Sequence, residues 1–101
     1  MSQIHPTAVI DPTVGIGSNC SIGKNCVIRP NAVIGLCSDL APGVFIYENA
    51  EIGGHVKIGM HTCIEADVKI GGESRIGKNC IIKRGSYLPY GTVLPDNSRI
   101  G

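Results

Sequence analysis

The chain has 101 residues, a formal net charge of +1, 17% charged residues, five cysteines, three tyrosines, one phenylalanine and no tryptophan. A near-neutral chain of this length allows one small domain and gives no reason to expect nucleic acid or an anionic membrane surface as a partner. It has no apolar stretch of about 18 residues that could span a bilayer, and its first residues lack the basic and then apolar layout typical of a signal peptide. We therefore expect a cytoplasmic protein whose cysteines are reduced thiols.

An aliphatic residue stands at every sixth position of the chain. The series is Ile4, Ile10, Ile16, Ile22, Ile28, Ile34, Leu40, Ile46, Ile52, Ile58, Ile64, Ile70, Ile76, Ile82, Leu88, Leu94 and Ile100. No helix has a period of six residues, whereas a fixed period in sequence means a fixed step in space. The period therefore predicts a solenoid built from hexapeptides.

Each hexapeptide is numbered here from its aliphatic residue, which is position one. Position five is always small or β-branched, and positions five, six, one and two alternate between inside and outside, as in a short strand. In chain order we expect strands at 8–11, 14–17, 20–23 and then at every sixth residue up to 98–101.

Position four predicts a sharp corner after every strand. All asparagines of the chain fall there, together with three glycines and Asp67. These residue types tolerate a left-handed backbone conformation. The asparagines are Asn19, Asn25, Asn31, Asn49, Asn79 and Asn97.

Three strands and three corners make one coil of about 18 residues, so each strand should pair in parallel with the strand 18 residues later. The expected fold is all-β, a three-sided parallel β-helix of about five and a half coils. It forms a single domain at 1–101 with no inserted loops, and its axis is filled by stacked aliphatic side chains.

The motif of an aliphatic residue, often followed by glycine, with a small residue four positions on resembles the hexapeptide-repeat transferase superfamily. The segment IGKNC at 22–26 recurs at 76–80. The opening IHPTAVI at 4–10 and the segment GHVKIG at 54–59 are similar to sugar-nucleotide acyltransferases. The resemblance implies a left-handed β-helix, although ordinary parallel crossovers are right-handed.

This resemblance implies an acyltransferase that moves an acetyl or longer acyl group from coenzyme A or an acyl carrier protein to a sugar amine or hydroxyl. A histidine serves as general base in such enzymes, since imidazole titrates near neutrality. His55 and His61 are the candidates, although both stand at position four, where the corner alone accounts for a histidine. Glu73 lies in the column of His55, one coil later, and could orient the imidazole.

Three cations, Lys78, Lys83 and Arg84, are candidates for binding the phosphates of coenzyme A, although an ordinary solvated surface is the simpler explanation of them. The resemblance further implies a homotrimer. An outward apolar stripe suggests a subunit interface, unless it reflects only the β-branched preference of strands. The stripe consists of Val9, Val27, Phe45, Cys63 and Ile81.

Two other functions remain open. A non-catalytic β-helical scaffold would explain the absence of loops, and its C-terminal coil could stack end to end on another chain because open strand edges are normally covered. A γ-class carbonic anhydrase shares the fold but needs three histidines on zinc. Only His55 and His61 are near each other, and Cys37 is a poor third ligand, so we expect no metal.

Overall fold

The computed structural model describes residues 2–101. In this range the chain forms seventeen strands of two residues each, separated by connections of four residues. Every strand comprises positions six and one of a hexapeptide, so the strands are shorter than the four residues expected. Position five stays outside the ladder, and several of its amides bond to turn atoms or side chains instead, as in Ala8 N–H to His5 O at 3.0 Å.

The strands form three parallel sheets, here called A, B and C. Sheet A contains β1 (Gln3–Ile4), β4 (Ser21–Ile22), β7 (Asp39–Leu40), β10 (Lys57–Ile58), β13 (Arg75–Ile76) and β16 (Val93–Leu94). Sheet B contains β2 (Val9–Ile10), β5 (Val27–Ile28), β8 (Phe45–Ile46), β11 (Cys63–Ile64), β14 (Ile81–Ile82) and β17 (Arg99–Ile100). Sheet C contains β3 (Gly15–Ile16), β6 (Val33–Ile34), β9 (Glu51–Ile52), β12 (Lys69–Ile70) and β15 (Tyr87–Leu88).

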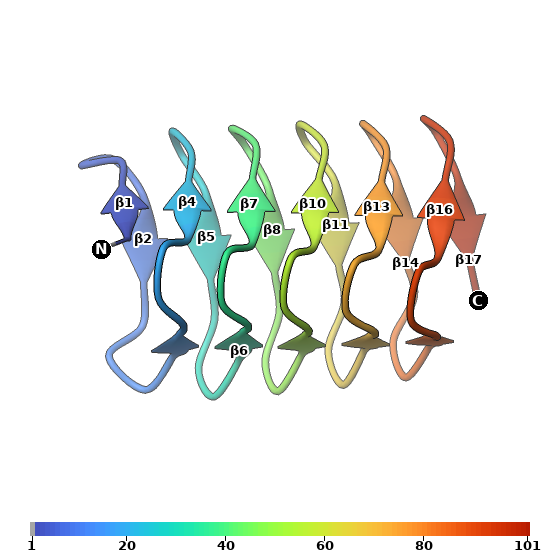
Figure 1. Cartoon of the computed structure of the whole chain (residues 1–101), viewed down its shortest axis with the longest axis horizontal. Coiled ribbons are helices and arrows are strands. Elements are labelled where there is room, and N and C mark those ends of the chain that lie inside the picture. Colours follow the sequence, from blue (N-terminus) through green and yellow to red (C-terminus); the bar gives the residue numbers. More distant parts are fainter. Residues whose placement is uncertain (1) are drawn as a thin grey trace.

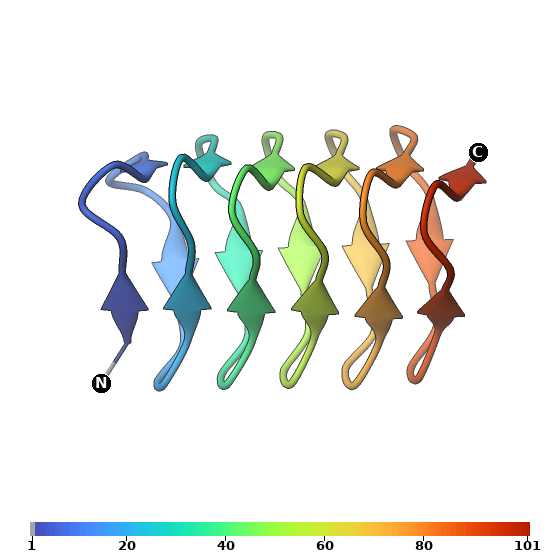
Figure 2. The same cartoon turned by 90° about the horizontal axis from the view of Figure 1, so that it is seen from above.

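Consecutive strands belong to different sheets, so the chain winds from A to B to C and back to A. Each residue pairs with the residue 18 positions later, as Phe45 does with Cys63. The result is the expected left-handed parallel β-helix of between five and six coils. Figure 1 shows the strands of sheet A in front and those of sheet B behind them, with the chain termini at opposite ends of the molecule. Figure 2 shows the same coils from above.

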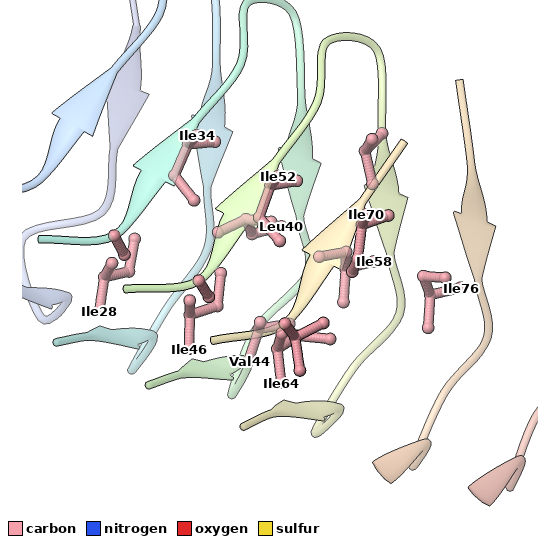
Figure 3. Packing of buried hydrophobic residues seen from close by; sticks show 14 of the residues in the cluster. Ile28, Ile34, Leu40, Val44, Ile46, Ile52, Ile58, Ile64, Ile70 and Ile76 are labelled. Carbon is pink, nitrogen blue, oxygen red and sulfur yellow. The ribbon is translucent and has the colours of Figure 1, made fainter. Parts of the chain in front are cut away.

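Stacked position-one side chains fill the axis of the helix (Figure 3). In the central coils they are excluded from solvent; Ile46 and Ile64, for example, are 0% exposed. The first coil is more open, and Ile4 is 45% exposed. Burial therefore grows from the ends toward the middle, as it must when each coil contacts only its neighbours.

Position four has a left-handed backbone conformation in fourteen of the corners that residues 2–101 describe. These residues are Asn19, Asn25, Asn31, Cys37, Gly43, Asn49, His55, His61, Asp67, Glu73, Asn79, Gly85, Gly91 and Asn97. The corners predicted at position four are thus confirmed. Cys37 and Glu73 have the same left-handed conformation, although their residue types do not predict it. Thr7 and Thr13 lack the positive φ. Instead, their hydroxyls accept hydrogen bonds from the amides of Asn25 and Asn31 one coil later.

Buried hydroxyl and thiol groups at position five tie one coil to the next. The Thr62 hydroxyl donates to Gly77 O at 2.7 Å and accepts from Cys80 N–H at 3.2 Å. The Cys20 thiol donates to Gly35 O at 3.1 Å in the same way. No buried side-chain nitrogen or oxygen in residues 2–101 lacks a partner, as interiors require.

The three corner columns differ at position two. This residue is glycine in four of the five connections from C to A and in three of the six from A to B. At these glycines a Cβ would press on the next coil. At Gly35 that Cβ would lie 2.4 Å from Gly53 C. The connections from B to C, here called the B–C corner, carry larger side chains. Their position-two residues are Asp11, Arg29, Tyr47, Glu65 and Lys83.

Candidate functional site

His55 lies on the connection from β9 to β10, in the corner between sheets C and A. Its side chain is exposed, and its φ is 58°. Its backbone amide donates to Leu36 O at 2.8 Å, and the amide of Glu73 donates to Gly54 O at 2.9 Å. These ladder bonds hold Cys37, His55 and Glu73 in one column on successive coils, about 4.8 Å apart.

Glu73 has a side-chain partner that the sequence did not reveal. The hydroxyl of Tyr90 donates a hydrogen bond to the Glu73 carboxylate, and this bond raises the pKa of Tyr90 above its usual value. The ring of Tyr90 lies beside Gly72. Within residues 2–101 no hydrogen bond or ion pair joins the side chains of His55 and Glu73. The carboxylate thus interacts with a phenol and not with the imidazole.

His61 lies on the connection from β10 to β11, in the corner between sheets A and B. The strand β10 therefore separates it from His55 along the chain. Its exposed imidazole packs over Gly43 one coil below, in the place that a Cβ at Gly43 would occupy. The structure thus places the two histidines at different corners of one coil.

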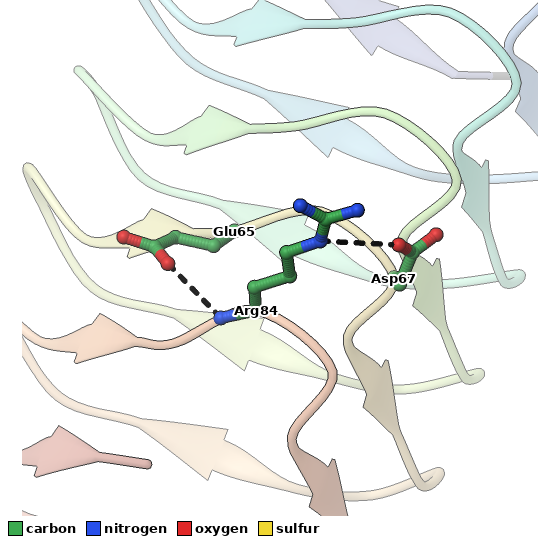
Figure 4. Close-up of polar contacts among 3 residues, drawn as sticks. All are labelled: Glu65, Asp67 and Arg84. Atoms are coloured by element: carbon green, nitrogen blue, oxygen red, sulfur yellow. Dashed lines mark hydrogen bonds and ion pairs between the residues drawn. The ribbon is translucent and has the colours of Figure 1, made fainter.

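The three candidate cations do not gather at one place. Lys78 lies at the corner between sheets A and B, whereas Lys83 and Arg84 lie at the B–C corner. Arg84 Nε is 3.6 Å from Asp67 Oδ2, and its backbone amide donates to Glu65 Oε1 at 2.9 Å (Figure 4). Lys78 and Lys83 make no ion pair with any carboxylate of residues 2–101.

The apolar stripe predicted from the sequence lies in register on the outer side of sheet B. Val9 is 63% exposed, and the other four side chains are half-buried. The ring of Phe45 packs on that of Tyr47 with centroids 4.6 Å apart. Desolvation, with a smaller effect of the Glu65 charge, raises the pKa of the Cys63 thiol.

Two open depressions mark the N-terminal coils. One lies beside Ser2, Ile4 and His5. The other lies on sheet B between Val9 and Val27 and extends to Asp11 and Arg29. Neither is lined by His55, His61 or Glu73.

No metal centre is formed by side chains within residues 2–101: no three His, Cys, Asp or Glu groups converge there as ligands. All five cysteines are free thiols. The same residues include no helix long and apolar enough to cross a membrane.

Chemically, the C–A corner offers an exposed imidazole for proton transfer, a thiol below it and a carboxylate–phenol pair above it. Sequence reasoning found the imidazole and the carboxylate from their column but missed Tyr90. Tyr90 stands at position three, one residue out of that column, so the period gave no signal for the contact.

The comparison with protein families matches residues 1–36 and 55–90 to "Bacterial transferase hexapeptide (six repeats)". The matched segments cover more than half of the chain and include His55 and Glu73. A search of the curated proteins finds no match.

Several solved structures share the fold. Serine acetyltransferase isoform 3 from Entamoeba histolytica superposes with a TM-score of 0.79 and 22% identity, over 88% of this chain and 35% of that protein. LpxA from Acinetobacter baumannii superposes with a TM-score of 0.70 and 27% identity, over 97% of this chain and 45% of that protein. The H141N mutant of perosamine N-acetyltransferase from Caulobacter crescentus, in complex with CoA and GDP-perosamine, superposes with a TM-score of 0.52. Its identity is 18%, over 92% of this chain and 50% of that protein. This chain thus spans half or less of the length of these relatives.

Proposed function

We propose, from the premise that the chain belongs to the bacterial hexapeptide transferase family, that it transfers an acyl group from a coenzyme A or acyl-carrier thioester to a sugar amine or hydroxyl. The observation that carries the proposal is the exposed His55 imidazole within a matched segment, with Glu73 one coil above it. An acetyltransferase solved with CoA and a nucleotide sugar shares the fold and supports this choice of substrates.

In the proposed reaction, His55 accepts a proton from the acceptor amine or hydroxyl as that group attacks the thioester carbonyl. The new bond joins the acceptor nitrogen or oxygen to the carbonyl carbon. The carbon–sulfur bond then breaks, and the donor thiol leaves with the proton that the imidazole returns. His61 is the alternative base, on the other side of β10.

Glu73 would act as a positioning residue for His55. The Glu73 carboxylate also interacts with the hydroxyl of Tyr90, whose pKa it raises. A carboxylate has lone pairs for several donors, so that of Glu73 can also accept a hydrogen bond from the imidazole N–H once a ligand orders the site. One molecule of coenzyme A would take its phosphate contacts either from Lys83 and Arg84, which share the B–C corner, or from Lys78 at the corner between sheets A and B; Arg84 is already engaged by Asp67.

The binding of coenzyme A is the first test. The thermal unfolding temperature of the wild-type chain should rise with coenzyme A concentration, because a ligand that binds only the folded state stabilises it. In acetyl transfer to amino-sugar acceptors, His55→Gln should lower kcat by about 100-fold or more, the range of a lost general base. His61→Gln, a matched change at the other corner, should leave kcat near the wild-type value. No rise in unfolding temperature with saturating coenzyme A would reject the proposal.

We further propose that the chain works in the cytoplasm as a homo-oligomer. The free thiols support that compartment. The apolar stripe on sheet B supports contact between copies, and a homotrimer is the form that the family resemblance implies. Light scattering on the purified protein measures the number of copies.

A non-catalytic scaffold is the second candidate. The observation that favours it is the uninterrupted run of four-residue connections, since no loop projects from residues 2–101 to enclose a ligand. A scaffold should lack both coenzyme A binding and acyl transfer, and it should form end-to-end filaments through the C-terminal coil. Electron microscopy of concentrated protein would detect them.

A further inference from the structure

Lys57 and Arg75 are the only two residues of like charge that the described part of the chain brings into register on neighbouring strands. The other registers between charged residues join opposite signs, namely Lys57 with Asp39 and Lys69 with Glu51. The two cations are exposed on the outer face of sheet A, with Cα atoms about 4.8 Å apart. Like charges directly opposite one another destabilise a sheet, so the fold alone gives no reason for this pair.

Neither of these cations is neutralised within one copy of the chain. Among the described residues, no carboxylate lies within ion-pair distance of Lys57 or Arg75. Arg29, Lys69 and Arg84, by contrast, each have a carboxylate partner, at 3.5, 4.0 and 3.6 Å. Two unpaired cations on successive coils can each bind one negative group of a dianion. A guanidinium matches a phosphate with its planar fork, and an ammonium binds the next phosphate as a point charge.

The pair adjoins the C–A corner, where the candidate base lies. Lys57 follows His55 by two residues, so their Cα atoms are no more than about 7 Å apart. Arg75 follows Glu73 by the same step. In both coils the residue between them, at position five, is fully buried, whereas positions four and six are exposed. The two cations and the candidate base therefore share one outer surface.

We propose that Lys57 and Arg75 bind the diphosphate of a nucleoside-diphosphate sugar, and that this sugar is the acyl acceptor. The assignment of the acceptor rests on the function proposed above, in which His55 is the base. In such a compound the sugar ring is bonded directly to the diphosphate, so its amine or hydroxyl can reach an imidazole next to the two cations. In coenzyme A the thioester lies at the far end of the long pantetheine arm. A diphosphate bound this close to the base therefore belongs to the acceptor and not to the donor.

The neighbours of the pair set the direction of the ligand. Asp39 lies one coil below Lys57 in the same column, and its carboxylate repels a phosphate there. Val93 lies one coil above Arg75. It is 69% exposed, as is Tyr90 on the connection before it. Apolar and aromatic side chains bind a nucleoside rather than a phosphate. We therefore expect the sugar at the level of Lys57, beside the imidazole, and the nucleoside above Arg75.

The site is compatible with a trimer built through the apolar stripe. The stripe lies on sheet B, beyond the corner between sheets A and B. Position six of sheet A lies on the other side of its sheet, next to the C–A corner. Contact between copies through sheet B therefore leaves Lys57 and Arg75 accessible to a ligand.

NMR titration of the backbone amides with UDP and with GDP tests the site. Two charge-assisted contacts on an open surface give a dissociation constant of about 0.1–1 mM, and the largest shifts should occur in β10 and β13. Lys57→Gln and Arg75→Gln should each raise the dissociation constant about tenfold or more. Lys24→Gln removes the same charge at the corner between sheets A and B, so this matched control should bind as the wild type does. The same spectra show that each variant keeps the fold.

Pyrophosphate and coenzyme A separate the two sources of a diphosphate. Pyrophosphate should compete with UDP, since the diphosphate supplies the charged contacts. Neither Lys57→Gln nor Arg75→Gln should change the dependence of the unfolding temperature on coenzyme A. Weaker coenzyme A binding by both variants would assign the diphosphate to the donor and overturn the proposal. An absence of UDP and GDP binding at millimolar concentration, or an equal loss in Lys24→Gln, would also overturn it.

The acceptor site and the proposed acyl transfer fail in different ways. Nucleotide binding without any response to coenzyme A would reject acyl transfer, and with it the role of the sugar as acceptor. A response to coenzyme A without nucleotide binding would reject the diphosphate site alone.

Discussion

The increase in burial from the first coil to the middle predicts that one substitution has different effects at equivalent positions. Ile64 is 0% exposed and Ile4 is 45% exposed, yet both stand at position one. Ile→Ala removes three carbon atoms. At about 0.8 kcal/mol for each, burial of these atoms in Ile64 contributes about 2.4 kcal/mol. The cavity left behind brings the expected loss for Ile64→Ala to about 3–4 kcal/mol.

For Ile4→Ala we expect a loss of about 1 kcal/mol, because half of the side chain is already in water and no closed cavity forms. Urea denaturation followed by circular dichroism measures both losses. The thermal midpoint should fall by about 12 °C or more for Ile64→Ala, at about 4–8 °C per kcal/mol for a domain of this size. Equal losses for the two variants would refute a core that is built up coil by coil.

Three further predictions follow from the corners and the buried hydroxyls. Thr62→Val should cost about 1–3 kcal/mol in the free energy of unfolding, because the carbonyl of Gly77 loses its buried donor; chemical denaturation would show no loss if the bond were unimportant. Asn49→Ala should cost about 1–2 kcal/mol while Asn49→Gly stays near zero, since only the alanine is strained at positive φ; equal values would contradict this. Tyr90 should ionise at a higher pH than a free tyrosine, and Glu73→Gln should lower that pH, as followed by absorbance near 295 nm. Since the folded pKa is raised, any stability linked to Tyr90 is present below its unfolded pKa and lost as pH rises through the folded one.

Much of the fold could be predicted because the same period of six specifies both the buried residues and the corners. Position one determines the core and position four determines the corners, so the register of 18 follows without knowledge of any contact. The strand limits could not be predicted, because the partner of a position-five amide depends on local geometry. The amide of Ala8 bonds to its own turn, at His5 O, whereas that of Val56 donates to the Ser38 hydroxyl of the preceding coil at 3.3 Å.

For the candidate site, the sequence predicts which residues stack in one column on successive coils, but not which side chains contact one another. The period places Glu73 above His55, but the direction of an exposed side chain is decided by its neighbours. Tyr90, not His55, is the side chain whose pKa the Glu73 carboxylate raises. For the same reason Lys78, Lys83 and Arg84 look adjacent in sequence, whereas a strand of sheet B lies between the first and the other two.

The constant step also gives a rule for rearranging the chain. Excising 18 residues from the middle would shorten the molecule by one coil and leave every later residue on its own sheet. Excising six would preserve the hexapeptide pattern and the core, yet it would turn everything downstream by a third of a revolution. Half of the stripe would then point in a new direction. The length of the excised segment thus decides whether only the number of coils changes or also which residues lie on each outer face.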